Sequence, residues 1–121
     1  AHGDLMDALN DSATPVDPEV SEVDAIGLET VAFADWPVPR LAAARVALAC
    51  TLHQDVSVDG SAQNLLLGRI HHAWVHDDLW TEDHKGRPAV DPERLDPVAR
   101  LGGTLYAQLG ALTSKARKQT L

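Results

Sequence analysis

The hydrophobic pattern is clearest in the middle of the chain. Over residues 44–56 (ARVALACTLHQDV), apolar side chains alternate with small or polar ones, which is typical of a strand with one buried face. A turn sequence at 59–61 (DGS) follows, and a second apolar run begins at Asn64. Together these segments predict a long antiparallel hairpin. Gly68, within the second run, predicts a bulge or a bend there.

Shorter elements are predicted before this hairpin. Residues 4–10 place apolar side chains at helical spacing behind an acidic first turn, which predicts a short helix. Residues 11–24 hold two prolines and five acids and predict an extended connector. Residues 25–34 alternate as a short strand does, and Pro37 and Pro39 are expected to end that strand.

Helical turns are predicted after the hairpin. Two Asp-Pro pairs, at 91–92 and 96–97, favour them, because an aspartate caps a helix whose first residue is proline. The second turn is expected to close at the Gly102-Gly103 pair, acting as a helix C-cap and not as a phosphate loop. Residues 113–121 are polar and basic, and predict a tail or an arm that docks on a partner.

Composition and charge narrow the class of protein. The chain has 121 residues, a length that fits one domain. Of these residues 45% are hydrophobic, and the formal net charge is −8. It shows neither a membrane-spanning run nor a basic, apolar signal sequence, so a cytoplasmic protein without membrane partners is expected. The basic cluster is confined to Lys115, Arg117 and Lys118, so nucleic acid is not an expected partner. The single cysteine, Cys50, is expected to be an inert core residue.

Histidines are the candidate metal ligands. His72 and His76 would share one face of a helix, but in a strand they lie about 13 Å apart, too far to share an ion. Adjacent His71 and His72 are expected to point to opposite faces of a strand, so no metal site is predicted. The sequence contains no nucleophile elbow, phosphate loop or dinucleotide fingerprint, and no catalytic side chain is predicted.

Five segments occur in an order that is typical of a known family. They are Glu22 with Ile26-Gly27-Leu28; Pro39-Arg40-Leu41 with the strand VALACTL; the run from Asn64 to Ile70 with its Gly68; Asp77-Asp78-Leu79; and Arg100, Gly102, Gly103 and Tyr106 in RLGGTLY. In this order, over roughly a hundred residues, they resemble the C-terminal part of a flavin reductase-like, FMN-binding split-barrel domain. Ala49 stands where that family often has glutamate, and Ala44-Arg45 where it often has Ser-Pro.

The resemblance implies a fold and an assembly. Residues 1–121 are expected to form a single domain, mainly β with short helices, as part of an antiparallel split β-barrel. The family's opening strands, which usually hold the flavin phosphate and much of the ring, have no counterpart in the sequence. The chain is therefore expected to be a C-terminal portion: a truncated frame, a processed fragment or one of two chains that complete a barrel. Uncovered strands predict an obligate homo-oligomer, a dimer by analogy with the family.

The resemblance also implies a function. In the family, NAD(P)H passes a hydride to the flavin N5, so the chain is expected to be an NAD(P)H:FMN oxidoreductase with FMN as cofactor. The alternative is a truncated, non-enzymatic dimerisation or interaction module that no longer binds flavin. A flavin-dependent oxygenase partner is compatible with the family but is not identified by the sequence.

Four residues are the candidates for binding FMN: Arg100, Gly102, Gly103 and Tyr106. The Arg100 guanidinium is permanently cationic and suits the flavin phosphate or the charge of the reduced ring. Tyr106 could supply a ring contact or a hydroxyl. In the structural alternative, Arg100 satisfies carbonyls in the last turn of a helix and Tyr106 anchors the segment on the barrel. Aromatic rings are few, so a working site is expected to borrow contacts from a partner chain or to use aliphatic and backbone contacts.

Overall fold

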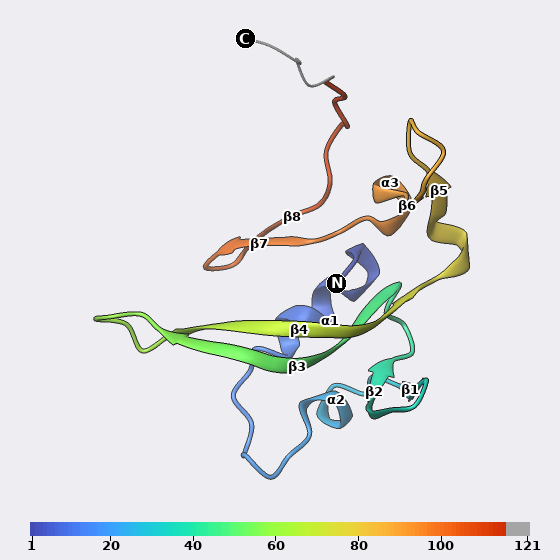
Figure 1. Cartoon of the computed structure of the whole chain (residues 1–121). Helices are drawn as coiled ribbons and strands as arrows, with labels where there is room; N and C mark the ends of the chain where they lie inside the picture. Colours follow the sequence, from blue (N-terminus) through green and yellow to red (C-terminus); the bar gives the residue numbers. More distant parts are fainter. Residues whose placement is uncertain (116–121) are drawn as a thin grey trace.

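The computed structural model describes residues 1–115 as a mainly β chain with short helices (Figure 1). Residues 116–121, which include Arg117 and Lys118 of the predicted tail, lie outside the described residues. The elements in chain order are the 3-10 helix η1 (Gly3–Leu5), α1 (Met6–Asp11), α2 (Glu22–Ala25), β1 (Thr30–Phe33), β2 (Trp36–Leu41), β3 (Val46–Ser57), β4 (Asn64–Val75), the 3-10 helix η2 (Asp77–Leu79), β5 (Trp80–Glu82), β6 (Pro88–Val90), α3 (Pro92–Leu95), β7 (Ala99–Gly102) and β8 (Leu105–Ala107).

The predicted long hairpin is the pair β3 and β4. The strands run antiparallel from the Val46–Val75 pair to the Ser57–Asn64 pair. The register shifts twice, leaving His71 of β4 and His53 of β3 without a direct partner, so two bulges flank Gly68. A β-carbon at position 68 would lie 3.3 Å from the Cys50 Cβ, which explains the glycine. The predicted hairpin and bulge are confirmed.

The first half of the chain departs from the sequence prediction in two places. The connector is not extended throughout, because Ser21 caps α2 by accepting a hydrogen bond from the Asp24 backbone N–H at 3.3 Å. Pro37 and Pro39 do not end a strand; they lie inside β2, which pairs with β1. That sheet has only two strands, and an edge strand tolerates residues that lack an N–H.

The C-terminal third confirms one predicted helix and corrects the other. Asp91 caps α3 by accepting hydrogen bonds from the backbone N–H groups of Glu93 and Arg94, at 2.9 and 3.1 Å. Asp96 does not cap a second helix: it ends α3 in the left-handed conformation, with φ +48°. Pro97 then pairs with His2 in an antiparallel bridge.

The Gly102-Gly103 pair is not a helix C-cap. Gly102 ends β7 opposite Leu105, and Gly103 begins the turn to β8; their φ angles of +101° and +55° are positive, a geometry that suits glycine. The sequence prediction was wrong here because it placed a helix before the pair, whereas Ala99 and Arg100 form a strand.

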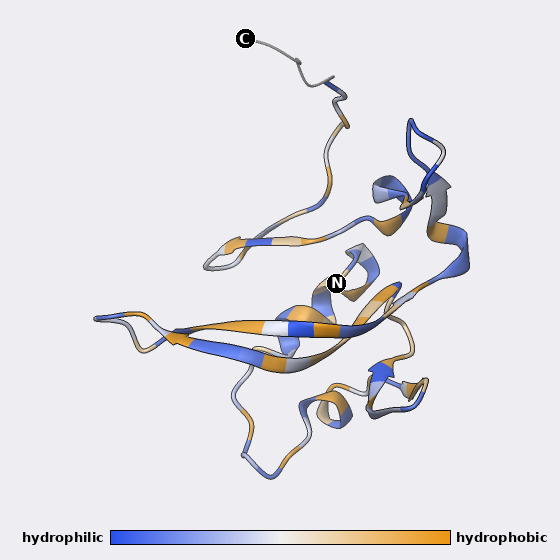
Figure 2. Cartoon of the chain, in the orientation of Figure 1, coloured by the Kyte–Doolittle hydropathy of each residue, from blue (hydrophilic) through white to orange (hydrophobic). Residues whose placement is uncertain are grey.

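The buried core of the described chain is small. Phe33, Ala49 and Leu79 are its buried apolar residues, and His2 is the buried polar one. Along β3 and β4, by contrast, large apolar side chains are exposed, and Figure 2 shows hydrophobic stretches on both strands. They are Leu48, Leu52, Leu65, Leu66, Leu67 and Ile70.

The sheets of the described chain are open. Residues 1–115 form four separate two-stranded sheets, so each strand has one unpaired edge. Cys50 lies exposed on β3, so its predicted place in the core is wrong for this chain. Its strand alternates as a half-buried strand does, but no other element within residues 1–115 covers that position. Among the described helices, none is long and apolar enough to cross a membrane.

Candidate functional site

The four predicted flavin-site residues lie on one hairpin. Arg100 of β7 and Tyr106 of β8 are direct cross-strand partners; Gly102 ends β7, and Gly103 lies in the turn that follows. The tertiary structure therefore brings all four together, although on strands and not at the helix end that the sequence predicted. Cross-strand partners have β-carbons about 5 Å apart, so Arg100 and Tyr106 start from adjacent points on the hairpin.

Arg100 is an exposed cation. Within residues 1–115 its side chain forms no hydrogen bond or ion pair, whereas Arg45, Arg87 and Arg94 each pair with an aspartate. The proposed role in satisfying carbonyls of a helix is excluded, because the residue lies in a strand. An exposed guanidinium without a carboxylate neighbour suits a phosphate.

The glycine turn and Tyr106 complete the hairpin. A β-carbon at Gly102 or Gly103 would meet no atom within 4 Å, so the turn faces open space. Tyr106 is half-buried, and its hydroxyl donates a hydrogen bond to Asn10 Oδ1 at 3.2 Å. Tyr106 thus links β8 to the end of α1.

A second polar and aromatic cluster joins β2 to β4. The Trp36 ring stacks on His71 at 5.1 Å and meets the edge of His72 at 5.6 Å. Arg40 lies over the Trp74 ring, 3.6 Å from its centre, in a cation–π contact. Both tryptophans are thus engaged within the chain.

The prediction that His71 and His72 point to opposite faces of the strand is wrong. Both rings contact Trp36, because the bulge at His71 interrupts the alternation of β4. His71 is further held by a 2.9 Å contact between its Nε2 and Thr51 Oγ1, and His72 lies 3.7 Å from Asp35. The two histidines thus bring β4 into contact with Trp36 of β2. In the described part of the chain, no three His, Cys, Asp or Glu side chains gather as metal ligands would.

A third cluster centres on Asp78, in η2 just after β4. Arg45 Nη2 donates to Asp78 Oδ2 at 2.8 Å, and His76 Nδ1 lies 2.6 Å from Asp78 Oδ1. Arg94 donates to the backbone carbonyl of Asp78 at 2.8 Å. Desolvation raises the pKa of Asp78, but the hydrogen bonds and positive charges of His76 and Arg45 outweigh it, so the pKa falls below its ordinary value.

The lowered pKa of Asp78 predicts a loss of stability in acid. Its folded-state pKa lies below its unfolded-state value, so the contact stabilises the fold above about pH 4 and is lost as the pH falls through the folded-state pKa. Asp78→Asn is expected to lower the urea midpoint at neutral pH and to reduce the drop in midpoint on acidification. Asp77→Asn is the control, since it removes a neighbouring exposed carboxylate. Equal pH dependence in the two variants would contradict this role.

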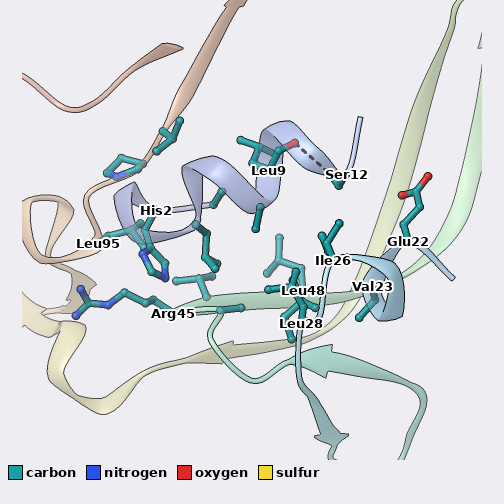
Figure 3. Close-up of a pocket in the computed structure, with 18 residues that line it drawn as sticks. His2, Leu9, Ser12, Glu22, Val23, Ile26, Leu28, Arg45, Leu48 and Leu95 are labelled. Carbon is teal, nitrogen blue, oxygen red and sulfur yellow. Dashed lines mark hydrogen bonds between the residues drawn. The ribbon is translucent and has the colours of Figure 1, made fainter. Parts of the chain in front are cut away.

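An apolar pocket of about 590 Å³ lies between α1, α2 and the start of β3 (Figure 3). Aliphatic side chains form most of its wall, including Leu5, Leu9, Ile26 and Leu48, and none of the predicted flavin-site residues lines it. The sequence analysis did not find this pocket, because it is assembled from segments far apart in the chain. Only the helical spacing of Leu5 and Leu9 in the sequence indicated a helix with an apolar face at this place.

Solved structures define the class of protein. The chain superposes on nitrilotriacetate monooxygenase component B from Bacillus cereus with a TM-score of 0.79 and 27% identity, covering 94% of this chain and 56% of that one. It superposes on a putative flavin reductase with a split-barrel domain from Shewanella frigidimarina with a TM-score of 0.82 and 19% identity, covering 98% and 58%. The fold is therefore that of the flavin reductase-like split-barrel proteins, and the resemblance drawn from the sequence is confirmed.

Relatives found by sequence are also matched over nearly all of this chain and about half of their own length. An uncharacterized protein of Halalkalibacterium halodurans is 35% identical over 116 residues, which are 93% of this chain and 53% of that protein. No protein-family model matches the sequence. The chain spans about half the length of the curated relatives it matches.

Proposed function

We propose that the chain is the C-terminal portion of a flavin-binding oxidoreductase that uses NAD(P)H to reduce FMN. The observation that carries this proposal is the superposition of nearly the whole chain on a nitrilotriacetate monooxygenase component B and on a putative flavin reductase with a split-barrel domain. The β7–β8 hairpin adds local support, since it offers an exposed cation beside an open glycine turn.

In this proposal the protein's own residues bind and orient the cofactor. Arg100 holds the phosphate of FMN by charge-assisted hydrogen bonds, and the turn at Gly102 and Gly103 lets a ligand approach the backbone closely. Tyr106 fixes the hairpin against α1 through Asn10. FMN, when bound, supplies the ring that accepts the hydride, so no side-chain acid or base is assigned.

The site requires more polypeptide than this hairpin. Trp36 and Trp74 are engaged by His71 and Arg40, so they are not available to stack on a flavin ring. The exposed apolar side chains of β3 and β4 form a patch of the kind that is typical of a protein–protein interface. We therefore propose a homodimer, in which the second chain buries this face and contributes ring contacts.

A flavin titration tests the proposed function. Purified chain is added to FMN and the flavin fluorescence is followed; saturable quenching is expected, and NADH oxidation that depends on added FMN should follow at 340 nm. Binding without NADH oxidation would indicate a flavin carrier. The absence of saturable quenching would favour the non-enzymatic dimerisation module, for which the exposed β3–β4 face is the structural support.

A further inference from the structure

The apolar pocket between α1 and β3 has two long walls. Leu5, Leu9 and Ser12 recur at helical spacing and so lie on one face of the first helical segment. Val46 and Leu48 are two residues apart on β3 and so share one face of that strand. Figure 3 shows Leu9 and Leu48 on opposite sides of the pocket. The helical wall is about 10 Å long, enough for a hydrocarbon chain to lie along it.

Other segments bound the two ends of the pocket. Val23 and Ile26, one helical turn apart in α2, form one end, and His2 and Leu95 lie at the other (Figure 3). Four segments that are distant in sequence therefore surround the same space. This arrangement distinguishes the pocket from the uncovered face of a single sheet.

The size of the pocket is that of a small-molecule site. Its volume is about 590 Å³, and Leu48 in its wall remains 52% exposed, so the side chains of the pocket do not fill it. An apolar cavity of about 150 Å³ already suffices to bind benzene, and ligand pockets commonly measure about 300–1,000 Å³. An apolar molecule considerably larger than benzene would therefore fit.

The polar side chains of the wall are mostly engaged within the chain. Ser12 Oγ donates to the Leu9 carbonyl at 2.9 Å, and His2 Nε2 lies 3.0 Å from the Ala43 carbonyl. Arg45 donates to the carboxylate of the cluster around η2 at 2.8 Å. In residues 1–115, no buried side-chain nitrogen or oxygen lacks a hydrogen-bond partner. The interior therefore offers a ligand aliphatic surface and does not demand a charged group from it.

Glu22 determines the charge that the pocket tolerates. It is exposed, lies at the α2 end of the pocket, and within residues 1–115 forms no hydrogen bond or ion pair through its side chain (Figure 3). Its carboxylate would repel an anionic head group at this end. Among the described residues that line the pocket, none is Phe, Tyr or Trp, so an aromatic ligand would find none of these rings to stack on.

We propose that this pocket is a second ligand site, which binds an uncharged aliphatic molecule of medium chain length. The hydrocarbon chain lies between the α1 and β3 walls, where transfer from water stabilises it, and a small polar end remains at the mouth near Glu22. None of the predicted flavin-site residues lines the pocket. The proposal therefore does not rest on the proposed flavin function.

Titration calorimetry with 1-hexanol, 1-heptanol and 1-octanol tests the ligand class. Each alcohol is expected to bind saturably at one site per chain, and each added methylene to tighten binding by about fourfold until the pocket is filled. Octanoate should bind at least about threefold more weakly than 1-octanol, because its charge meets that of Glu22. Glu22→Gln should remove most of this difference and leave 1-octanol binding unchanged. Absence of saturable alcohol binding, or octanoate binding as tight as that of 1-octanol, would overturn the proposal.

Amide chemical shifts locate the bound alcohol. Addition of 1-octanol is expected to shift the backbone amides of Leu9, Ile26 and Leu48, which line the pocket. The amides of Leu52 and Leu66 should not shift, although their side chains are 67% and 63% exposed on the β3–β4 hairpin. Equal shifts in the two groups would show adsorption to any exposed apolar surface and would overturn the proposal. Pocket amides that shift on dilution without alcohol would also overturn it and assign the pocket to a second copy of the chain.

A matched pair of phenylalanine variants tests the pocket itself. Ala8 of α1 lines the pocket, so Ala8→Phe places a ring in the space and should weaken 1-octanol binding at least about tenfold. Ala62→Phe adds the same ring at an exposed position between β3 and β4, outside the pocket, and should leave binding unchanged. Equal binding by the two variants would contradict the assigned site.

A variant that enlarges the pocket provides an independent test. Leu9→Ala removes three carbon atoms from the α1 wall and should shift the preferred alcohol to a longer chain, because the added space is then filled by the ligand. This preference is measured on the chain-length series and does not depend on the Ala8 variant. An unchanged preference for chain length would overturn the assignment of the α1 wall.

These results and the FMN titration can fail separately. Alcohol binding is measured without flavin, so a chain that binds no FMN can still bind 1-octanol in the pocket. Conversely, a chain that binds no alcohol can still quench FMN fluorescence through Arg100, which lies on β7 and outside the pocket.

Discussion

Replacing Arg100 with glutamine is expected to weaken FMN binding by about tenfold to a hundredfold, because a hydrogen bond to a charged group contributes about 1.5–3 kcal/mol. Arg100 is exposed, lies in β7 and has no carboxylate partner among residues 1–115, so its charge is available to a phosphate. The measurement is the dissociation constant from flavin fluorescence quenching. Riboflavin, which lacks the phosphate, should bind equally to the variant and to the native chain.

Arg69→Gln is the matched control for the Arg100 variant. It removes the same charge from an exposed position on β4, where Arg69 Nη2 lies 3.2 Å from His53 Nδ1. FMN affinity should be unchanged in this variant at moderate ionic strength. If both substitutions weaken FMN equally, the effect comes from net charge, and Arg100 does not contact the phosphate. If riboflavin binding falls as much as FMN binding, Arg100 acts on the ring or on the fold.

Replacing Leu52 with lysine is expected to raise the dissociation constant of the homodimer by about a hundredfold or more, because an ammonium group buried without a partner costs several kcal/mol. Leu52 is 67% exposed in the single chain and lies on β3 among the other uncovered apolar residues. The native chain should elute, with light scattering, at twice its 13.0 kDa mass at micromolar concentration. The variant should dissociate to the single mass over the same range.

Val20→Lys is the control for Leu52→Lys. It introduces the same side chain at an apolar position that is 47% exposed and lies in the connector before α2, outside β3 and β4. Its elution should match that of the native chain. A native chain that stays a 13.0 kDa monomer at micromolar concentration would overturn the homodimer proposal.

Local patterns in the sequence were sufficient to predict several elements. The alternation around Cys50, the turn at 59–61 and Gly68 predicted the hairpin and its bulge, because strand pairing across a short turn depends on neighbouring residues. Asp91 predicted the start of α3 for the same reason, since a capping side chain reaches backbone groups two and three residues away.

The same local rules failed where distant contacts decide the conformation. Asp96-Pro97 has the same letters as Asp91-Pro92, yet Asp96 ends a helix, because the backbone of the following residues pairs with His2 and Ala1, nearly a hundred positions away. Pro39 lies in a strand because β2 keeps an open edge, which no sequence window reveals.

For the candidate site, the order of short motifs selected Arg100, Gly102, Gly103 and Tyr106, but it could not say how they meet. The hairpin between β7 and β8 places Arg100 opposite Tyr106, and the turn gives the two glycines their left-handed geometry. The contacts of His71 and His72 with Trp36 also required the structure, because one bulge reverses the faces that strict alternation predicts.

The sequence by itself determined the central hairpin, the first turn of α3 and the split-barrel resemblance, since each depends on residues close together in the chain or on the order of motifs. Only the tertiary structure decided what is buried. Burial depends on segments far apart in sequence, and in residues 1–115 few of them cover β3 and β4, so Cys50 and Leu52 are exposed although their pattern predicts a buried face.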